Sequence, residues 1–259
     1  MPAVAWLFVP AHRERSLARA FDADADVVIL DLEDGVPVEQ KERARALARE
    51  ALADHEAWVR VGAAGTAACD EDLTAVAERA TGVRLPKVQS ARDIARVQER
   101  AGVPVGCTIE TALGVVRAVE IAATPGLAHI AFGAADLAAD LNVDAESPTL
   151  VTARAQVVLA ARAAGLDDVI DGAYTHTKDP DGLRDACLRA RALGFTGKSA
   201  IHPRQVPIIK EAFATSRDER LWAEAVLNAF DREGGPATLP TGEFVDAAVV
   251  ARAQRFLGR

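Results

Sequence analysis

The chain has 259 residues, half of them hydrophobic, with a net charge of −8 and a pI near 5.2. The acidic balance argues against a nucleic-acid partner, which usually needs a basic surface, but local arginines can still bind an anionic small molecule. Three scattered cysteines without a CxxC pair or a Cys/His cluster argue against a disulfide framework and a zinc site. With no signal pattern and no apolar run near about 18 residues, we expect a reduced cytoplasmic protein without a membrane segment.

Short apolar runs alternate along the chain with longer amphipathic stretches rich in Ala, Arg and Glu. The expected strands are Ala5–Val9, Val27–Leu32, Trp58–Val61, Val83–Lys87, Val105–Ile109, His129–Gly133, Asp168–Asp171 and Thr196–Ala200. The expected helices between them are Arg13–Phe21, Glu39–Ala53, Glu71–Ala80, Ala91–Ala101, Ala112–Ala123, Thr149–Ala164 and Pro180–Leu193. This alternation predicts βα units and a parallel sheet. Eight strands favour a closed (β/α)8 TIM barrel; a doubly wound open sheet is the alternative, but its glycine-rich first turn is missing.

Three further helical segments follow the eighth expected strand, at Arg204–Ser216, Asp218–Arg232 and Val245–Phe256. The last two are separated by a connector rich in Gly, Pro and Thr, at Gly234–Gly242. This composition predicts a turn. We therefore predict a catalytic barrel over residues 1–216 and a C-terminal helical extension over 217–259. The extension either covers its own barrel or reaches a neighbouring subunit.

Charged residues occur at the carboxyl ends of most expected strands, where the loops of a TIM barrel build the active site. They are Asp31, Glu33, Asp34, Arg60, Lys87, Glu110, Asp136 and His202. Charged side chains entering an apolar barrel are costly unless they are paired or bind a metal. The pattern therefore predicts a functional site at this mouth of the barrel.

Glu110 and Asp136 follow neighbouring expected strands and are the best metal candidates. Two carboxylates without a nearby histidine or thiolate suit a hard cation such as Mg²⁺. The alternatives are a salt bridge with Arg60 or Lys87, or capping by Glu110 of the helix in IETALGV.

Three basic residues have two interpretations each. Arg60, in the apolar run WVRV, can clamp a substrate carboxylate or pair with Glu33 or Asp34. Lys87 either contacts the substrate through its positive charge or, in a second mechanism, forms a Schiff base with the substrate. Arg13, in a first loop that leads into a helix, either contacts an anionic ligand or is a solvated surface residue.

Seven ordered motifs resemble the citrate lyase β-subunit-like proteins of the HpcH/HpaI aldolase and malyl-CoA lyase family. They are WLFVPAHRER, VVILDLEDGV, WVRV, LPKVQSA, IETALGV, FGAADLAADL and GKSAIHPRQV, and the tail adds GEFVDAAVV. The resemblance spans about Trp6 to Phe213, and the order of the motifs makes it specific.

The resemblance implies a Mg²⁺-dependent carbon–carbon lyase that assembles as a trimer or a dimer of trimers. Glu110 and Asp136 would hold the ion, and Arg60 would bind the acid and offset charge that develops on its oxygen. Asp246 would come from a neighbouring subunit to exchange a proton with a thioester enolate. Arg13 would contact the CoA or acyl-carrier arm. The expected substrate is a 3-hydroxyacyl-CoA such as citryl- or malyl-CoA, which is cleaved to a 2-oxo acid and an acyl-CoA.

Glu33 and Asp34 would support the metal in such an enzyme, and Ala135 in FGAAD would contact the substrate. Two positions depart from the family pattern: Gly62 stands where relatives often have asparagine, and no proline follows Asp246. Three other functions stay open, namely a CoA-independent 2-oxo-acid aldolase, an acyl-CoA thioesterase and a non-catalytic barrel subunit.

Overall fold

The computed structural model describes residues 3–258, which form two units that meet in the sequence at Phe213 and Ala214. The sequence places the corresponding boundary three residues later. Within the described residues, no helix is both long and apolar enough to cross a bilayer.

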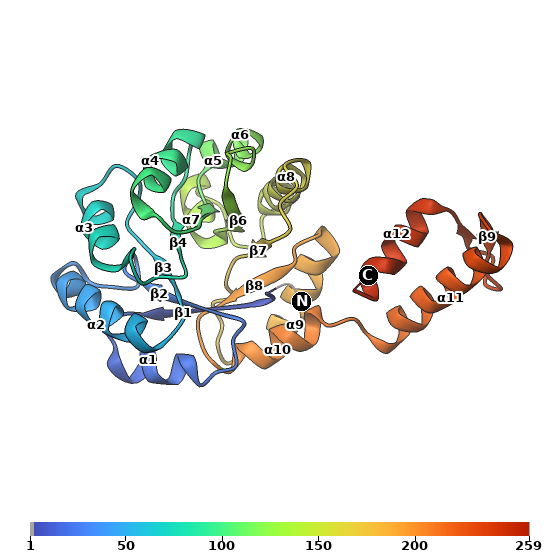
Figure 1. Cartoon of the computed structure of the whole chain (residues 1–259), viewed down its shortest axis with the longest axis horizontal. Helices are drawn as coiled ribbons and strands as arrows, with labels where there is room; N and C mark the ends of the chain where they lie inside the picture. Colours follow the sequence, from blue (N-terminus) through green and yellow to red (C-terminus); the bar gives the residue numbers. More distant parts are fainter. Residues whose placement is uncertain (1–2, 259) are drawn as a thin grey trace. The chain divides into compact units, whose positions relative to one another are not determined.

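The larger unit is a closed barrel of eight parallel strands, each hydrogen-bonded to the next, with β8 returning to β1 (Figure 1). The strands are β1 (Ala5–Pro10), β2 (Val27–Asp31), β3 (Trp58–Arg60), β4 (Gly82–Leu85), β5 (Val105–Ile109), β6 (Leu127–Phe132), β7 (Val169–Asp171) and β8 (Gly197–Ala200). Every predicted strand is present, with ends that differ by at most two residues. The TIM barrel is therefore confirmed, and the open sheet is excluded.

Helices surround the ring of strands on its outside (Figure 1). They are α1 (Glu14–Phe21), η1 (Val38–Gln40), α2 (Lys41–Asp54), α3 (Ala67–Val76), α4 (Ala91–Ala101), α5 (Ala112–Val116), α6 (Ala118–Ala122), α7 (Ala134–Leu141), α8 (Pro148–Ala163), α9 (Pro180–Leu193) and α10 (Gln205–Phe213). The structure corrects three predictions. The helix expected at Glu71–Ala80 begins earlier, because Thr66 caps it at Cys69 N. The helix expected at Ala112–Ala123 is interrupted at Arg117, and the sequence prediction missed α7.

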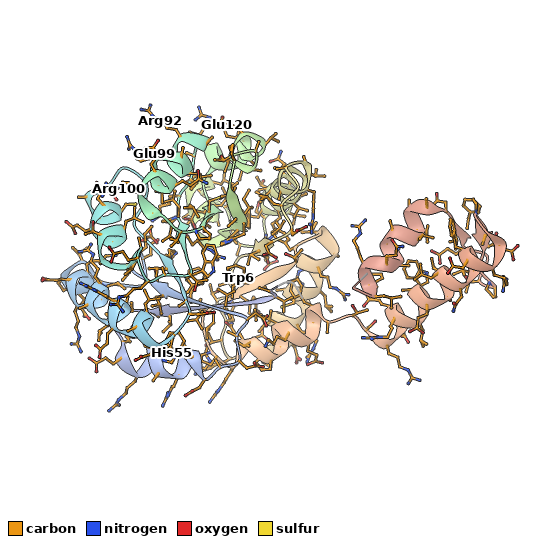
Figure 2. All side chains as sticks on the ribbon, in the orientation of Figure 1. Trp6, His55, Arg92, Glu99, Arg100 and Glu120 are labelled. Atoms are coloured by element: carbon orange, nitrogen blue, oxygen red, sulfur yellow. The ribbon has the colours of Figure 1, made fainter. Side chains whose placement is uncertain are left out.

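Two apolar layers follow from the alternation of side chains along the strands. A large core joins the outer face of the sheet to the helices, and a small cluster fills the barrel interior. The fully buried members of the small cluster are Trp6, Ile29, Ala131 and Ile170. Figure 2 shows Trp6 within the ring of strands, whereas Arg92, Glu99 and Glu120 project outward from the helices.

The barrel interior also contains a fully buried arginine, which the sequence analysis did not single out. Arg84 Nε donates to His129 Nε2 at 3.0 Å, and its guanidinium lies 4.6 Å from the Trp6 ring centroid. Its two Nη atoms have no hydrogen-bond partner among the described residues. Burial lowers the pKa of Arg84 to about 9. The His129 ring packs 4.6 Å from both Trp6 and Trp58, so aromatic rings enclose this polar pair.

The smaller unit contains α11 (Arg217–Glu233), a two-stranded antiparallel sheet of β9 (Ala237–Thr238) and β10 (Phe244–Val245), and α12 (Ala247–Phe256). A capping box between Ser216 and Glu219 starts α11, and Gly234 in the left-handed conformation ends it. Its core includes Ala223, Val226, Val245 and Ala253, which are buried within this unit. The predicted extra C-terminal helices are therefore present with a core of their own.

The packing of His129 predicts that Gly106 tolerates no side chain. A Cβ added at Gly106 would lie 2.1–2.5 Å from His129 ring atoms, and the aromatic neighbours leave that ring little room to move. Gly106→Ala should lower the free energy of unfolding by about 1–3 kcal/mol in urea titrations. Gly235→Ala is the control because an added Cβ meets no atom within 4 Å there. Equal stability of the two variants would contradict this packing account.

Candidate active site at the barrel mouth

Seven charged side chains lie at or just after the carboxyl ends of strands β2 to β6. We call this group the mouth cluster; it consists of Asp31, Glu33, Asp34, Arg60, Lys87, Glu110 and Asp136. Strand ends converge at one mouth of a closed parallel barrel, which brings these residues together from distant parts of the sequence. The sequence analysis placed all seven at this mouth and assigned a role to each of them except Asp31.

Arg60 is fixed at the end of β3 by a bidentate interaction with Asp31, at the end of the neighbouring strand β2. Its Nε and Nη2 donate to the two Asp31 oxygens at 2.8 and 2.7 Å, and Nη1 lies 3.2 Å from Glu33 Oε2. Burial opposes the charge, but the hydrogen bonds and negative charges of Asp31 and Glu33 outweigh it and raise the pKa of Arg60. The pairing with Glu33 is thus confirmed, and Asp31 is the partner that the sequence analysis missed. These contacts use three of the five guanidinium N–H groups, so two can serve a ligand.

Lys87 connects the acids that follow β2 with Glu110, which follows β5. Its Nζ donates to Glu33 Oε1 at 2.5 Å and to Asp34 Oδ2 at 3.0 Å, while its backbone N–H donates to Glu110 Oε1 at 2.8 Å. The backbone reaches this geometry in the left-handed region, at φ 53°, which is uncommon for a residue other than glycine. Although burial opposes its charge, the two carboxylates raise the pKa of the Lys87 ammonium. A Schiff base requires a neutral amine, so the structure disfavours that second mechanism.

Glu110 is buried immediately after β5 and is not neutralised by an ion pair within residues 3–258. Burial, followed by the nearby charge of Asp136, raises the pKa of Glu110 to about 7. Asp136 is half-buried in the first turn of α7, so the two carboxylates come from adjacent βα units as predicted. Thr111, not Glu110, caps the following helix α5, which removes the capping alternative. A second alternative, a salt bridge of Glu110 with a side-chain cation, is absent among the described residues.

The backbone beside Glu110 leaves space for its carboxylate. A Cβ at Gly133 would lie 2.3 Å from Glu110 Oε2, so glycine is required for this approach of β6. One oxygen, Oε1, accepts the Lys87 N–H, and Oε2 faces Gly133. Within residues 3–258 no three His, Cys, Asp or Glu side chains could hold a metal together. The residues present thus fit an ion that takes two carboxylates and completes its coordination with water and substrate oxygens, as Mg²⁺ commonly does.

Three other predicted site residues lie outside the mouth cluster. Ala135 is exposed in the first turn of α7, where backbone N–H groups lack intrahelical partners. Arg13 is exposed directly before α1 and donates from Nε to His12 Nε2 at 3.2 Å. Asp246 belongs to the smaller unit, where its Oδ1 caps α12 by accepting from Ala248 N and Val249 N at 2.9 and 3.0 Å.

Gly62 occupies the position after β3 at which the family pattern often has asparagine. Its N–H donates to the buried Asp72 Oδ2 at 2.9 Å, and Asp72 also pairs with Arg45 at 2.6 Å. A Cβ at Gly62 would lie 2.9 Å from Cys69 N, in the first turn of α3. A larger side chain at this position therefore requires a shift of α3.

The raised pKa of Glu110 predicts a pH-dependent stability of the metal-free protein. Between its usual value near 4.5 and about 7, the unfolded chain releases the Glu110 proton while the folded chain retains it. The free energy of unfolding should therefore fall with rising pH in this window, by up to about 3 kcal/mol. Glu110→Gln should remove that part of the decline, whereas Glu99→Gln on the outer surface should not. Urea unfolding at several pH values in EDTA measures the free energy of unfolding of each variant. If that free energy depends on pH in the same way for the wild type and Glu110→Gln, the raised pKa of Glu110 is refuted.

Comparisons with known proteins identify the family of the chain. The family model of HpcH/HpaI aldolase/citrate lyase matches residues 5–203. The chain is 37% identical to a (3S)-malyl-CoA thioesterase of Cereibacter sphaeroides, over 98% of this chain and 93% of the relative. It is 39% identical to a citrate lyase subunit beta-like protein of Mycobacterium tuberculosis, over 98% and 94%. A crystal structure of the M. tuberculosis protein CitE with magnesium, acetoacetate and coenzyme A superposes with a TM-score of 0.89 at 35% identity, covering 99% of this chain and 97% of that one. The chain therefore belongs to the HpcH/HpaI aldolase/citrate lyase family.

Proposed function

We propose that the protein is a Mg²⁺-dependent carbon–carbon lyase that cleaves or forms a 3-hydroxyacyl-CoA such as malyl- or citryl-CoA. The observation that carries the proposal is the charge imbalance of the mouth cluster. Five carboxylates face two side-chain cations there, and both cations are already engaged by Asp31, Glu33 and Asp34. Glu110 and Asp136 are thus left for a divalent cation, without which Glu110 retains its proton up to about pH 7.

Glu110 and Asp136 are the residues that would hold Mg²⁺. The M. tuberculosis relatives support this assignment because their crystal structures contain magnesium with acetoacetate, pyruvate or oxaloacetate. When bound, the ion would polarise an oxygen of the acid and offset its negative charge. Glu33 and Asp34 would act indirectly, because both hold Lys87, whose backbone N–H orients Glu110.

Arg60 and the start of α7 would orient the acid. The two remaining N–H groups of Arg60 can reach a carboxylate or an oxo oxygen, and Asp31 fixes the plane of the guanidinium before substrate arrives. The backbone N–H of Ala135 adds a donor next to Asp136. Cleavage removes the hydroxyl proton, breaks the bond between C2 and C3, and leaves the electron pair on the thioester enolate. Arg60 would stabilise the oxygen that becomes the carbonyl of the 2-oxo acid.

Asp246 would return a proton to C2 of the enolate from a neighbouring copy of the chain. Its Oδ1 is committed to the cap of α12, and its Oδ2 makes no hydrogen bond within the described part of the chain. An assembly into trimers or dimers of trimers would supply that copy. Apolar residues exposed on the barrel suit a subunit interface, among them Val116 and Val119, which are 81% and 66% exposed.

A basic pocket supports a thioester of coenzyme A as substrate. It lies between the loops after β1 and β8, has a volume of about 550 Å³, and is lined by Arg13, Arg19, His202 and Arg204 among others. The three arginines suit phosphate groups, and the apolar walls from β1 suit an uncharged arm. This pocket favours Arg13 as a ligand contact over a purely solvated role. It also favours a CoA-dependent reaction over a CoA-independent aldolase.

Thioester hydrolysis is the second candidate function. The observation that favours it is the 37% identity to a (3S)-malyl-CoA thioesterase. The same mouth could bind the 3-hydroxyacyl-CoA and admit water to its thioester bond. Hydrolysis then releases the hydroxy acid and the free thiol of coenzyme A, without a 2-oxo acid. A non-catalytic barrel is disfavoured because the whole mouth cluster, including Glu110, Asp136 and Arg60, is present.

Metal binding should depend on the two predicted ligands. Titration calorimetry with Mg²⁺ should give binding to the wild type and a loss of at least about tenfold in affinity for Asp136→Asn or Glu110→Gln. Asp144→Asn, an exposed carboxylate in the loop after α7, is the matched control and should bind normally. Unchanged affinity in both ligand variants would remove the site.

A substrate panel separates the candidate reactions. Malyl-, citramalyl-, citryl- and methylmalyl-CoA are incubated with Mg²⁺ and read for 2-oxo acid and for free thiol. A lyase releases 2-oxo acid without an equal amount of thiol, whereas a thioesterase releases thiol alone. Absence of both products from all four substrates would contradict the enzyme proposal.

Asp246→Asn should bind the oxo acid normally but lower turnover by about 100-fold, because it removes proton exchange. Asp231→Asn, an exposed acid on α11, is the control and should retain full activity. Wild-type turnover of Asp246→Asn on every substrate that the wild type converts would dismiss the proton-transfer role.

A further inference from the structure

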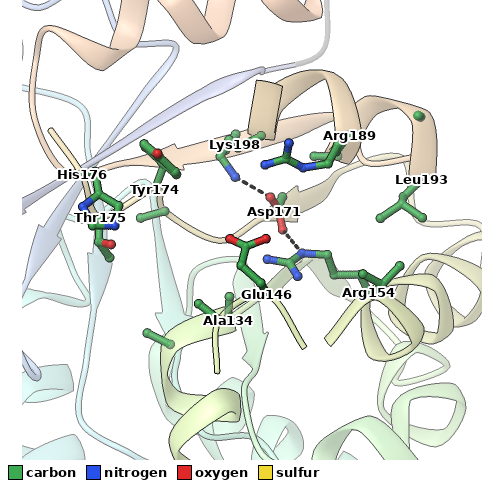
Figure 3. A pocket seen from close by; sticks show the side chains of 17 residues that line it. Ala134, Glu146, Arg154, Asp171, Tyr174, Thr175, His176, Arg189, Leu193 and Lys198 are labelled. Atoms are coloured by element: carbon green, nitrogen blue, oxygen red, sulfur yellow. Dashed lines mark hydrogen bonds and ion pairs between the residues drawn. The ribbon is translucent and has the colours of Figure 1, made fainter. Parts of the chain in front are cut away.

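The barrel unit contains a second cavity beside the mouth cluster, between the outer face of β7 and β8 and the helices α8 and α9 (Figure 3). Ala134 and Ala135 at the start of α7 form its border with the mouth. Its volume is about 510 Å³, which is enough for a small organic molecule. The cavity exists because residues facing it on several elements end at Cβ, including Ala173, Ala186 and Ala190. Leu193 and Val151 add further apolar surface. We call it the α8–α9 pocket.

The inner end of the α8–α9 pocket contains buried charges. Asp171 at the end of β7 forms ion pairs with Lys198 of β8 and with Arg154 Nε of α8, the latter at 3.0 Å. Ile170 points into the barrel, so Asp171 and its partners lie on the outer face of the sheet. Burial opposes ionisation of Asp171, but the charges of Lys198 and Arg154 outweigh it and lower its pKa. A cationic end is therefore built into the wall of the cavity.

Two arginines in the α8–α9 pocket retain free hydrogen-bond donors. Only Nε of Arg154 is engaged in a hydrogen bond, and its guanidinium faces the cavity. Arg189 of α9 also points toward Asp171 and Lys198, and it forms no ion pair within residues 3–258 (Figure 3). Three cations line the pocket against the carboxylates of Asp171 and Glu146, so one positive charge is left over. Glu146 is exposed on the loop before α8.

We propose that the α8–α9 pocket is a second ligand site, which binds a small organic carboxylate with a compact apolar body. Arg154 and Arg189 would bind the carboxylate, and the alanine-lined wall would hold the apolar part. Guanidinium groups suit this ligand because their planar N–H pairs match both carboxylate oxygens. Glu146 points to the same end of the cavity and competes with the ligand for those donors. Ala135 borders both sites, but the residues that would bind this carboxylate, Arg154 and Arg189, do not belong to the mouth cluster. Binding of the ligand therefore does not require Mg²⁺.

The probe for this site is 4-fluorobenzoate, whose binding to the full chain is followed by ¹⁹F NMR without metal. The wild type should show saturable binding. Arg189→Glu should weaken it by roughly tenfold, since it replaces an attraction with a repulsion. Glu146→Gln should strengthen it by about threefold, because a competing carboxylate is removed. Ala186→Phe should abolish binding without a change of charge, because the ring fills the cavity.

The matched control is Arg184→Glu, which makes the same charge change on α9 at a residue that does not line the pocket. This variant should bind the probe as the wild type does. Equal weakening by Arg184→Glu and Arg189→Glu would show general charge attraction and overturn the proposal. No saturable binding by the wild type, or no response to Arg189→Glu and Glu146→Gln, would also overturn it. Both of these variants change exposed residues, so the test does not depend on the folding of Ala186→Phe.

Discussion

The paired hydrogen bonds between Arg60 and Asp31 are the interaction on which the rest of the mouth depends. They join the ends of two neighbouring strands and keep a cation in place where burial alone would disfavour charge. With Asp31 neutralised in this way, Glu33 is free to bind both Arg60 and Lys87. Lys87 in turn directs its backbone N–H to Glu110. One ion pair therefore orders a chain of contacts that ends at the proposed metal ligand.

The same network explains why Glu110 remains unneutralised. Both side-chain cations of the mouth cluster are engaged by the acids at and just after the end of β2, and Glu110 receives only a neutral N–H donor. Burial and Asp136 then make its negative charge costly in the absence of a cation. A buried carboxyl without a cationic partner does not stabilise the fold near neutral pH, because its ionisation is costly there. It is reasonable for a site whose charge is balanced by a bound divalent ion.

The sequence predicted the eight strands because buried parallel strands form short apolar runs between amphipathic helices. It also placed Arg60, Lys87, Glu110 and Asp136 at one mouth, because each of them lies near the carboxyl end of a strand and these ends meet at one side of a parallel barrel. It could not assign partners among Asp31, Glu33 and Asp34, because three acids in four residues differ only in the direction of their side chains. The helix α7 was missed because it is only eight residues long and begins two residues after the end of β6, within the motif FGAADLAADL.

Arg84 and the α8–α9 pocket show a second limit of sequence reasoning. Arg84 lies in a four-residue strand whose inward face cannot be identified from so short a pattern. Its aromatic neighbours Trp6 and Phe8 come from a distant strand. Likewise, Asp171 and Lys198 each look like an ordinary charged residue near a strand end. Only the register of β7 with β8 pairs them, and only the alanines of α9 leave a cavity beside them.

The most direct test of the central claim is a crystal structure of the protein with Mg²⁺ and glyoxylate. The account predicts one ion bound by oxygens of Glu110 and Asp136 at about 2.0–2.1 Å, with the acid in contact with Arg60. An ion bound elsewhere, or Glu110 and Asp136 turned away from it while glyoxylate occupies the mouth, would contradict the account.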